Sequence, residues 1–122
     1  MKLVLLVFLG SGCGGALRYL ISKYLKFSIM GSFPLATFAV NVLGCFLIGL
    51  FTGLFNNSSI SHEVKTLLTV GFCGGFTTFS TFTNENFLLG KGGDMMMSIV
   101  YIVASLLVGL LALWGGYKVS GN

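Results

Sequence analysis

Charged side chains are scarce in this sequence, because Asp, Glu, Lys and Arg together make up only 8% of its 122 residues. A typical soluble domain carries about 25%. Proline and histidine each occur once, and the three cysteines, Cys13, Cys45 and Cys73, show no C-x-x-C spacing. These shortages argue against a soluble globule, a disulfide framework and a zinc site. We expect the cysteines to be small packing residues.

Apolar residues are correspondingly abundant, at 55% of the chain, and they gather into four long stretches. A helix of about 20 apolar residues crosses a hydrocarbon core of about 30 Å. We therefore expect an all-α membrane protein, with one transmembrane domain over residues 1–122 and four spans at about 3–22, 33–55, 65–89 and 97–117. The short loops that remain leave no room for a soluble catalytic or nucleic-acid-binding module, so the lipid bilayer is the expected surroundings and nucleic acid is not an expected partner.

The first span has a second interpretation, because Lys2 precedes an apolar run through Leu9, as in a signal peptide. Apolar residues resume after Cys13 and continue to Ile21. We therefore expect the stretch to remain as a span. A mature mass that lacks the first dozen residues would contradict this.

The positive charges hardly choose an orientation in the membrane. An even number of spans places both termini on one side, with three lysines there and four basic residues opposite: Lys2, Lys65 and Lys118 against Arg18, Lys23, Lys26 and Lys91. The positive-inside rule scarcely separates three from four. Either a weaker signal fixes one topology, or the protein inserts both ways and pairs antiparallel with itself. Four thin helices could hardly enclose a pathway alone, so we expect an oligomer in either case.

Small residues at four-residue spacing indicate where helices touch. The pairs are Gly10 and Gly14, Ser11 and Gly15, Gly49 and Gly53, and Gly71 and Gly75. Such spacing permits close backbone approach in a membrane, but in a glycine-rich chain it does not by itself predict a dimer contact.

The third span is unusually polar for a segment that must cross lipid. Residues 71–86 include the pair Gly74-Gly75, several Ser and Thr residues, and Glu85. An ionisable group at membrane depth suggests a function, although the hydroxyls could bond to their own helix and Glu85 could lie at the far interface. The glycine pair, followed by two Thr residues, predicts a helix break. Freed carbonyl oxygens there could bind Na⁺, or the glycines could serve only close packing.

Aromatic and polar side chains recur at helical spacing. Phe79 and Phe82 share one face, with Phe76 one turn earlier. They could be packing residues, or their electropositive ring edges could accompany a small anion. Polar pairs four residues apart in two other spans could line the same pathway or bond helices together; these are Thr37 with Asn41, and Tyr101 with Ser105.

Catalysis is not expected. His62 is the single histidine and lies in a polar loop, so no Ser-His or Cys-His pair can be placed in the membrane. The glycine-rich segments lack the context and following Lys of a phosphate-binding loop. Arg18 is interpreted as an interfacial anchor, with an anion-attracting vestibule as the alternative.

The stretch from Gly71 to Phe82 resembles the third-span signature of the CrcB, or Fluc, fluoride channels. The segments 14–19 and 41–44 fit the same family, and the similarity covers essentially the whole chain. The resemblance implies a fluoride-selective channel in a bacterial inner membrane, giving passive export of cytoplasmic fluoride without ATP. It further implies an antiparallel, dual-topology homodimer with two fluoride pathways.

The resemblance also implies roles for individual residues. Phe79 and Phe82 would be the pore phenylalanines, with Asn41 as a donor to fluoride. Gly74 and Thr77 would offer backbone carbonyls from both subunits to a structural Na⁺ at the dimer centre. Arg18 would be the family's first-span Arg. A polar track would contain Ser80, Thr81, Tyr101, Ser105, Glu85 and, less directly, Thr37.

Two rival functions remain. A proton-coupled exporter of the small multidrug-resistance type also has four spans, but that class depends on a first-span carboxylate, which this sequence lacks. A structural or assembly membrane protein would use its polar stripes only to bond helices, and it would conduct no ions.

Overall fold

The computed structural model describes residues 1–25 and 33–121, and these residues form helices and no strands. Three helices in the described chain are long and apolar enough to cross a membrane. They are α1 (Lys2–Leu25), α2 (Leu35–Asn57) and α6 (Met95–Gly121). Each ends a few residues beyond its predicted span, because a helix keeps its backbone groups bonded internally as it leaves the hydrocarbon core, while α2 begins two residues later than predicted. Lys26, counted above among the basic residues, lies outside the described residues.

The third predicted span is built from several pieces. The chain is helical from His62 to Phe76 as α3 (His62–Thr66), the π-helical η1 (Leu67–Cys73) and α4 (Gly74–Phe76), and it resumes as α5 (Ser80–Lys91). Ser61 begins this run, since its side chain accepts a hydrogen bond from the Val64 N–H at 3.2 Å. Because α5 continues through Lys91 and α6 begins at Met95, the turn between them is shorter than the gap between the predicted spans 65–89 and 97–117.

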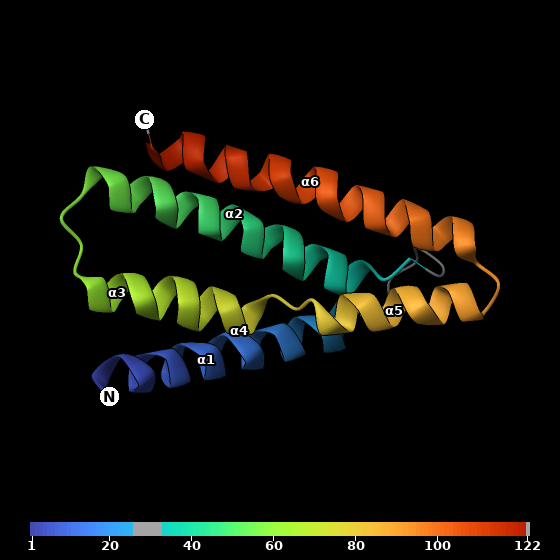
Figure 1. Cartoon of the computed structure of the whole chain (residues 1–122), viewed down its shortest axis with the longest axis horizontal. Coiled ribbons are helices and arrows are strands. Elements are labelled where there is room, and N and C mark those ends of the chain that lie inside the picture. Colours follow the sequence, from blue (N-terminus) through green and yellow to red (C-terminus); the bar gives the residue numbers. More distant parts are fainter. Residues whose placement is uncertain (26–32, 122) are drawn as a thin grey trace.

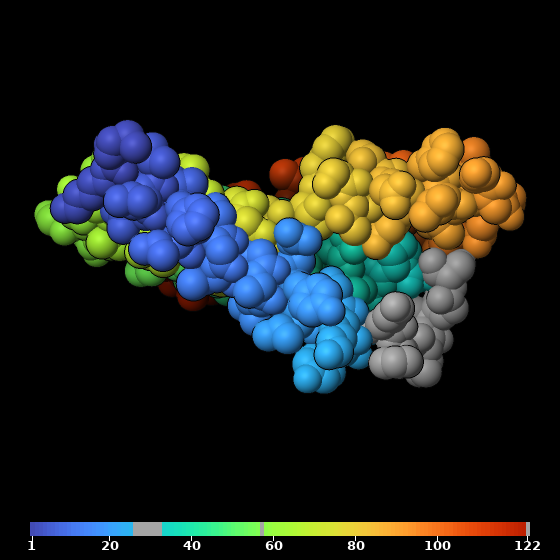
Figure 2. Space-filling view, turned by 90° about the horizontal axis from the view of Figure 1, so that it is seen from below, coloured from blue at the N-terminus to red at the C-terminus, as the bar shows by residue number. Residues whose placement is uncertain are grey.

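The helices form two neighbouring pairs (Figure 1). The most extensive packing between two helices is that of α2 against α6, while α1 packs against η1 and α4. Further along, α1 diverges from α5 (Figure 2), and α5 contacts α6. Both termini lie at the same end of the molecule (Figure 1). The interruption before α5 lies within the pair that contains α1 (Figure 1).

Glycines set the close approach of α1 to the interrupted helix. A Cβ atom on Gly14 would collide with the Phe72 carbonyl oxygen and lie 2.8 Å from the Phe76 nitrogen, and one on Gly75 would collide with the Ser11 backbone. The predicted contacts at the Gly10–Gly14 and Gly71–Gly75 spacings are thus confirmed within one chain. Gly15 has no neighbour closer than 3.9 Å to such an atom, so it is not needed for this contact.

The contact between α2 and α6 depends on glycines in the same way. A Cβ atom on Gly49 would collide with the Leu113 carbonyl oxygen, and one on Gly116 with the Phe46 carbonyl oxygen. Gly53 is equally close to Ser120, which confirms the Gly49–Gly53 spacing as a helix contact. Backbone atoms cannot rotate away as side chains can, so these positions exclude any larger residue without a shift of a whole helix.

We expect Gly14→Ala and Gly116→Ala each to lower the free energy of unfolding in mixed micelles by about 1–3 kcal/mol, the usual cost of overpacking. Gly12→Ala and Gly115→Ala are matched controls, because a Cβ atom at either position meets nothing within 4 Å. The assigned contacts would be contradicted if Gly12→Ala lowered the free energy of unfolding as much as Gly14→Ala, and Gly115→Ala as much as Gly116→Ala.

Candidate functional site

The interruption lies at residues 77–79. Thr77 has an extended backbone, with φ −85° and ψ 161°, and Phe79 returns to helical angles before α5. The break predicted from Gly74-Gly75 and the two following Thr residues is confirmed, and it falls at the Thr residues, because Gly74 and Gly75 are themselves helical. The glycines serve the approach of α1, and the helix ends where the Thr77 hydroxyl bonds back to the Cys73 carbonyl at 2.9 Å.

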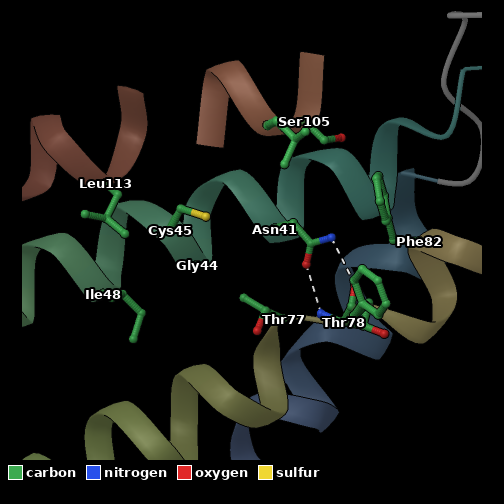
Figure 3. Close-up of a pocket in the computed structure, with 11 residues that line it drawn as sticks. Asn41, Gly44, Cys45, Ile48, Thr77, Thr78, Phe82, Ser105 and Leu113 are labelled. Carbon is green, nitrogen blue, oxygen red and sulfur yellow. Dashed lines mark hydrogen bonds between the residues drawn. The ribbon is translucent and has the colours of Figure 1, made fainter. Parts of the chain in front are cut away.

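Asn41 of α2 holds the interrupted backbone. Its Oδ1 accepts the Thr78 N–H at 2.9 Å, and its Nδ2 donates to the Thr78 carbonyl at 3.1 Å (Figure 3). A single amide side chain thus satisfies both backbone groups of a residue that has left the helix. The amide nitrogen carries a second N–H, so Asn41 keeps one donor beyond this pair of bonds.

Two carbonyls beside the interruption lose their helical partners. In a continuous helix the Gly74 and Thr77 carbonyls would accept the N–H groups of Thr78 and Thr81. Those N–H groups bond instead to Asn41 Oδ1 and, at 3.2 Å, to Thr78 Oγ1. The described residues contain no cluster of three or more His, Cys, Asp or Glu that could hold a metal. A cation here would therefore depend on backbone oxygens, which are suitable ligands for a hard ion.

Arg18 reaches the same segment from α1. Its Nε donates to the Gly75 carbonyl oxygen at 3.2 Å. The sequence suggested an interfacial anchor or a vestibule and did not predict this partner, because spacing along α1 does not show which backbone lies opposite.

The two candidate pore phenylalanines lie together just beyond the interruption. The ring centroids of Phe79 and Phe82 are 6.1 Å apart, and those of Phe82 and Tyr101 are 4.9 Å apart. Phe79 is 76% exposed. Phe76 does not continue this face, contrary to the prediction, because the break separates it from α5 and it is buried against Phe72.

A cavity of about 390 Å³ adjoins this pair of rings (Figure 3). Ser105 contributes the most unusual group, a buried hydroxyl for which the described residues offer no hydrogen bond. The lining residues come from α2, from α6 and from the interruption with the first turn of α5: Asn41, Gly44, Cys45, Ile48, Thr77, Thr78, Phe79, Phe82, Ser105, Leu106 and Leu113.

Glu85 brings two of the predicted polar residues together. The Thr37 hydroxyl donates to Oε2 at 2.7 Å, and the Tyr101 hydroxyl donates to Oε1 at 2.8 Å. Thr37 is 5% exposed and Tyr101 is fully buried. Both carboxylate oxygens thus have a donor inside the protein, and Glu85 joins α5 to α2 and α6.

Ser80 and Thr81 lie outside the cavity lining. The Ser80 side chain is exposed, with its Oγ 3.5 Å from Thr78 Oγ1, and the Thr81 N–H is bound by the same Thr78 hydroxyl. Only the family resemblance assigns these two residues to the polar track. The structure places them at the start of α5.

Several residues at the site were not singled out from the sequence. Gly44 admits the Thr77 methyl group, with which a Cβ atom would collide. Ser98 donates to Asn86 Oδ1 at 2.8 Å, and Asn86 Nδ2 donates to the Phe82 carbonyl at 2.9 Å. The polarity of Asn86 and Ser98 was the available signal, but nothing in their spacing shows that they are partners.

Comparison with known proteins agrees with the resemblance seen in the sequence. Residues 5–117 match the family described as CrcB-like protein, Camphor Resistance (CrcB). A protein of Phocaeicola vulgatus named fluoride-specific ion channel FluC is 45% identical over 120 residues, covering 98% of this chain and 99% of the relative.

Two further relatives extend the match to other organisms. A FluC of Flavobacterium psychrophilum is 42% identical over 117 residues, with 95% of this chain and 94% of the relative covered. A fluoride-specific ion channel FluC 2 of Rhodococcus jostii is 44% identical over 117 residues, with 96% and 97% covered. The chain, a multi-pass membrane protein, therefore belongs to the CrcB family.

Proposed function

We propose that this chain is a fluoride-selective channel that lets cytoplasmic fluoride leave the cell passively. Its relatives carry the name of such a channel and are not enzymes. The structural observation that carries the proposal is the interrupted helix held by Asn41, with Phe79 and Phe82 at its open end. A membrane protein that needed only an anchor would gain nothing from breaking a helix in the bilayer.

The groups around the cavity suit a small, strongly hydrated anion. The remaining Asn41 N–H, the Ser105 hydroxyl and the edges of the two rings can each replace a water molecule. No Lys or Arg is among the described residues that line the cavity. An anion can therefore enter without being held too tightly to leave, which is the compromise that conduction requires.

Glu85 orients neighbouring hydroxyl groups in the proposed pathway. Its two oxygens fix the hydroxyl groups of Thr37 and Tyr101, and Tyr101 in turn packs against the Phe82 ring. Ser80 and Thr81 extend the polar track at the exposed start of α5. In a cell with a negative interior, anion escape through such a pathway needs no ATP.

We further propose that the working unit is an antiparallel, dual-topology homodimer of four-span protomers with two pores, in a bacterial inner membrane. The nearly balanced basic residues allow both orientations. Among the described residues, few side chains are buried within one chain, and the largest that are almost completely covered are Val40, Cys73, Phe76 and Tyr101. The high exposure of Phe79 leaves one side of its pathway to be completed by a second copy.

A structural Na⁺ at the dimer centre would be held by the Gly74 and Thr77 carbonyls. The N–H groups that would normally bond to these oxygens are bound to Asn41 and Thr78, and Gly74 is exposed. The residues thus fit a hard cation. Bound there, Na⁺ would supply positive charge that neutralises carbonyl oxygens from both copies.

We expect Phe79→Ile and Phe82→Ile each to lower fluoride efflux from liposomes by more than about tenfold, equal to a barrier increase of about 1.4 kcal/mol. Isoleucine keeps bulk but removes the ring edge. Efflux is read with a fluoride electrode, and the dimer should persist in both variants.

Phe87→Ile is the matched control, because Phe87 is an exposed ring on the same helix that does not line the cavity. Unchanged efflux in both pore variants would contradict the aromatic role. If the unaltered chain also released no fluoride, the result would favour a structural membrane protein that conducts no ions.

We expect replacement of Na⁺ by a large organic cation throughout preparation to lower both the dimer fraction and fluoride efflux, because the freed carbonyls would then lack a counter-charge. Dimer fraction is measured by light scattering in detergent, and re-addition of Na⁺ is the control. A dimer fraction and a fluoride efflux that are both unchanged without Na⁺ would contradict the proposed Na⁺ site.

A further inference from the structure

The hydrogen bonds that a continuous helix would form oppose the interruption, and two of them lie at its start. In an α-helix the Gly74 carbonyl accepts the Thr78 N–H, and the Gly75 carbonyl accepts the Phe79 N–H. In the structure the Thr78 N–H is bound by Asn41, and the Gly75 carbonyl is bound by Arg18 Nε. One side chain therefore holds the N–H that has left the helix, and a second side chain from another helix supplies a donor to the Gly75 carbonyl at the helix end.

The charge of Arg18 suits its position. The helical run from His62 ends at Phe76, so its last carbonyls carry the partial negative charge of a helix carboxyl terminus. A guanidinium bonded to one of these carbonyls is favourable there, and the hydrogen bond is charge-assisted. The low dielectric of the surroundings strengthens both effects.

The backbone of α1 is firmly placed against this segment. Ser11 lies seven residues before Arg18, about two helical turns, and so on the same face of α1. Its hydroxyl donates to the Gly71 carbonyl at 3.2 Å, and the tight contact at Gly14 lies between the two donors. The backbone of Arg18 is therefore held in place, and its side chain reaches the Gly75 carbonyl without any movement of α1.

We propose that Arg18 is a positioning residue that stabilises the interrupted third span, by donating a charge-assisted hydrogen bond to the Gly75 carbonyl at the helix end while Asn41 holds Thr78. This rests on the proposed function, since the interruption matters only if it carries the anion pathway. Arg18 itself is absent from the cavity lining. It acts through the backbone, leaving the Gly74 and Thr77 carbonyls free and Phe79 at the open end.

The sequence allows a selective test. Only two glycines precede a phenylalanine, Gly71 and Gly75, so ¹³C-carbonyl Gly and ¹⁵N-Phe labelling gives two one-bond signals in solid-state NMR. One reports the carbonyl bound by Ser11 and the other the carbonyl bound by Arg18. A carbonyl carbon that loses a hydrogen bond moves upfield.

We expect Arg18→Gln to move the Gly75 signal upfield, whether its carbonyl is left unpaired or accepts the neutral Phe79 N–H of a restored helix, which is a weaker donor than the guanidinium. The Gly71 signal should stay in place, and fluoride efflux should fall by about tenfold or more, as loss of one charge-assisted hydrogen bond allows. Ser11→Ala should move only the Gly71 signal and keep efflux near that of the unaltered protein. Arg18→Lys retains a charged donor and should restore part of both the signal and the efflux.

An unmoved Gly75 signal in Arg18→Gln, with the Gly71 signal intact, would overturn the proposal. A moved Gly75 signal with undiminished efflux would overturn its link to conduction. Failure of the channel assignment is a separate result, because the NMR shifts need no fluoride, and the unaltered protein would then release none.

Discussion

A backbone segment that leaves its helix inside a bilayer has no water to satisfy its polar groups, and the Asn41 side chain takes the place of water for Thr78. One amide accepts the Thr78 N–H and donates to the Thr78 carbonyl. Without these two bonds, leaving the groups unpaired would cost several kcal/mol, and the segment would return to a helix. The site exists because these two bonds offset the free-energy cost of interrupting the helix.

Several features of the site follow from that interruption. It separates Phe76, which is fully buried, from Phe79 and Phe82, which line the cavity. It leaves the Gly74 and Thr77 carbonyls without helical donors. It also starts a new helix, capped by the Thr78 hydroxyl, that carries Glu85 to Thr37 and Tyr101. The glycine contacts on either side keep the surrounding helices close enough for short side chains to reach.

The sequence predicted this architecture to the extent that the signals were local. Apolar length predicted the long helices, and small-residue spacing predicted the contacts at Gly14 and Gly49. Glycine and threonine both weaken a helix, so the segment from Gly74 to Thr78 predicts a break, but local propensity cannot choose between neighbouring positions. The choice is made by Asn41, a partner distant in sequence. The bonds of Arg18 to Gly75 and of Ser98 to Asn86 were missed for the same reason.

The most direct test of the account is fluoride efflux from liposomes that contain Asn41→Leu. Leucine keeps the branch at Cγ but can bond neither group of Thr78, so we expect loss of fluoride efflux in a protein that still folds. Thr52→Val is the control, because it removes a hydroxyl that bonds only within α2, to the Ile48 carbonyl. Efflux from Asn41→Leu equal to that of the control and the unaltered protein would contradict the claim that the interruption held by Asn41 carries the anion.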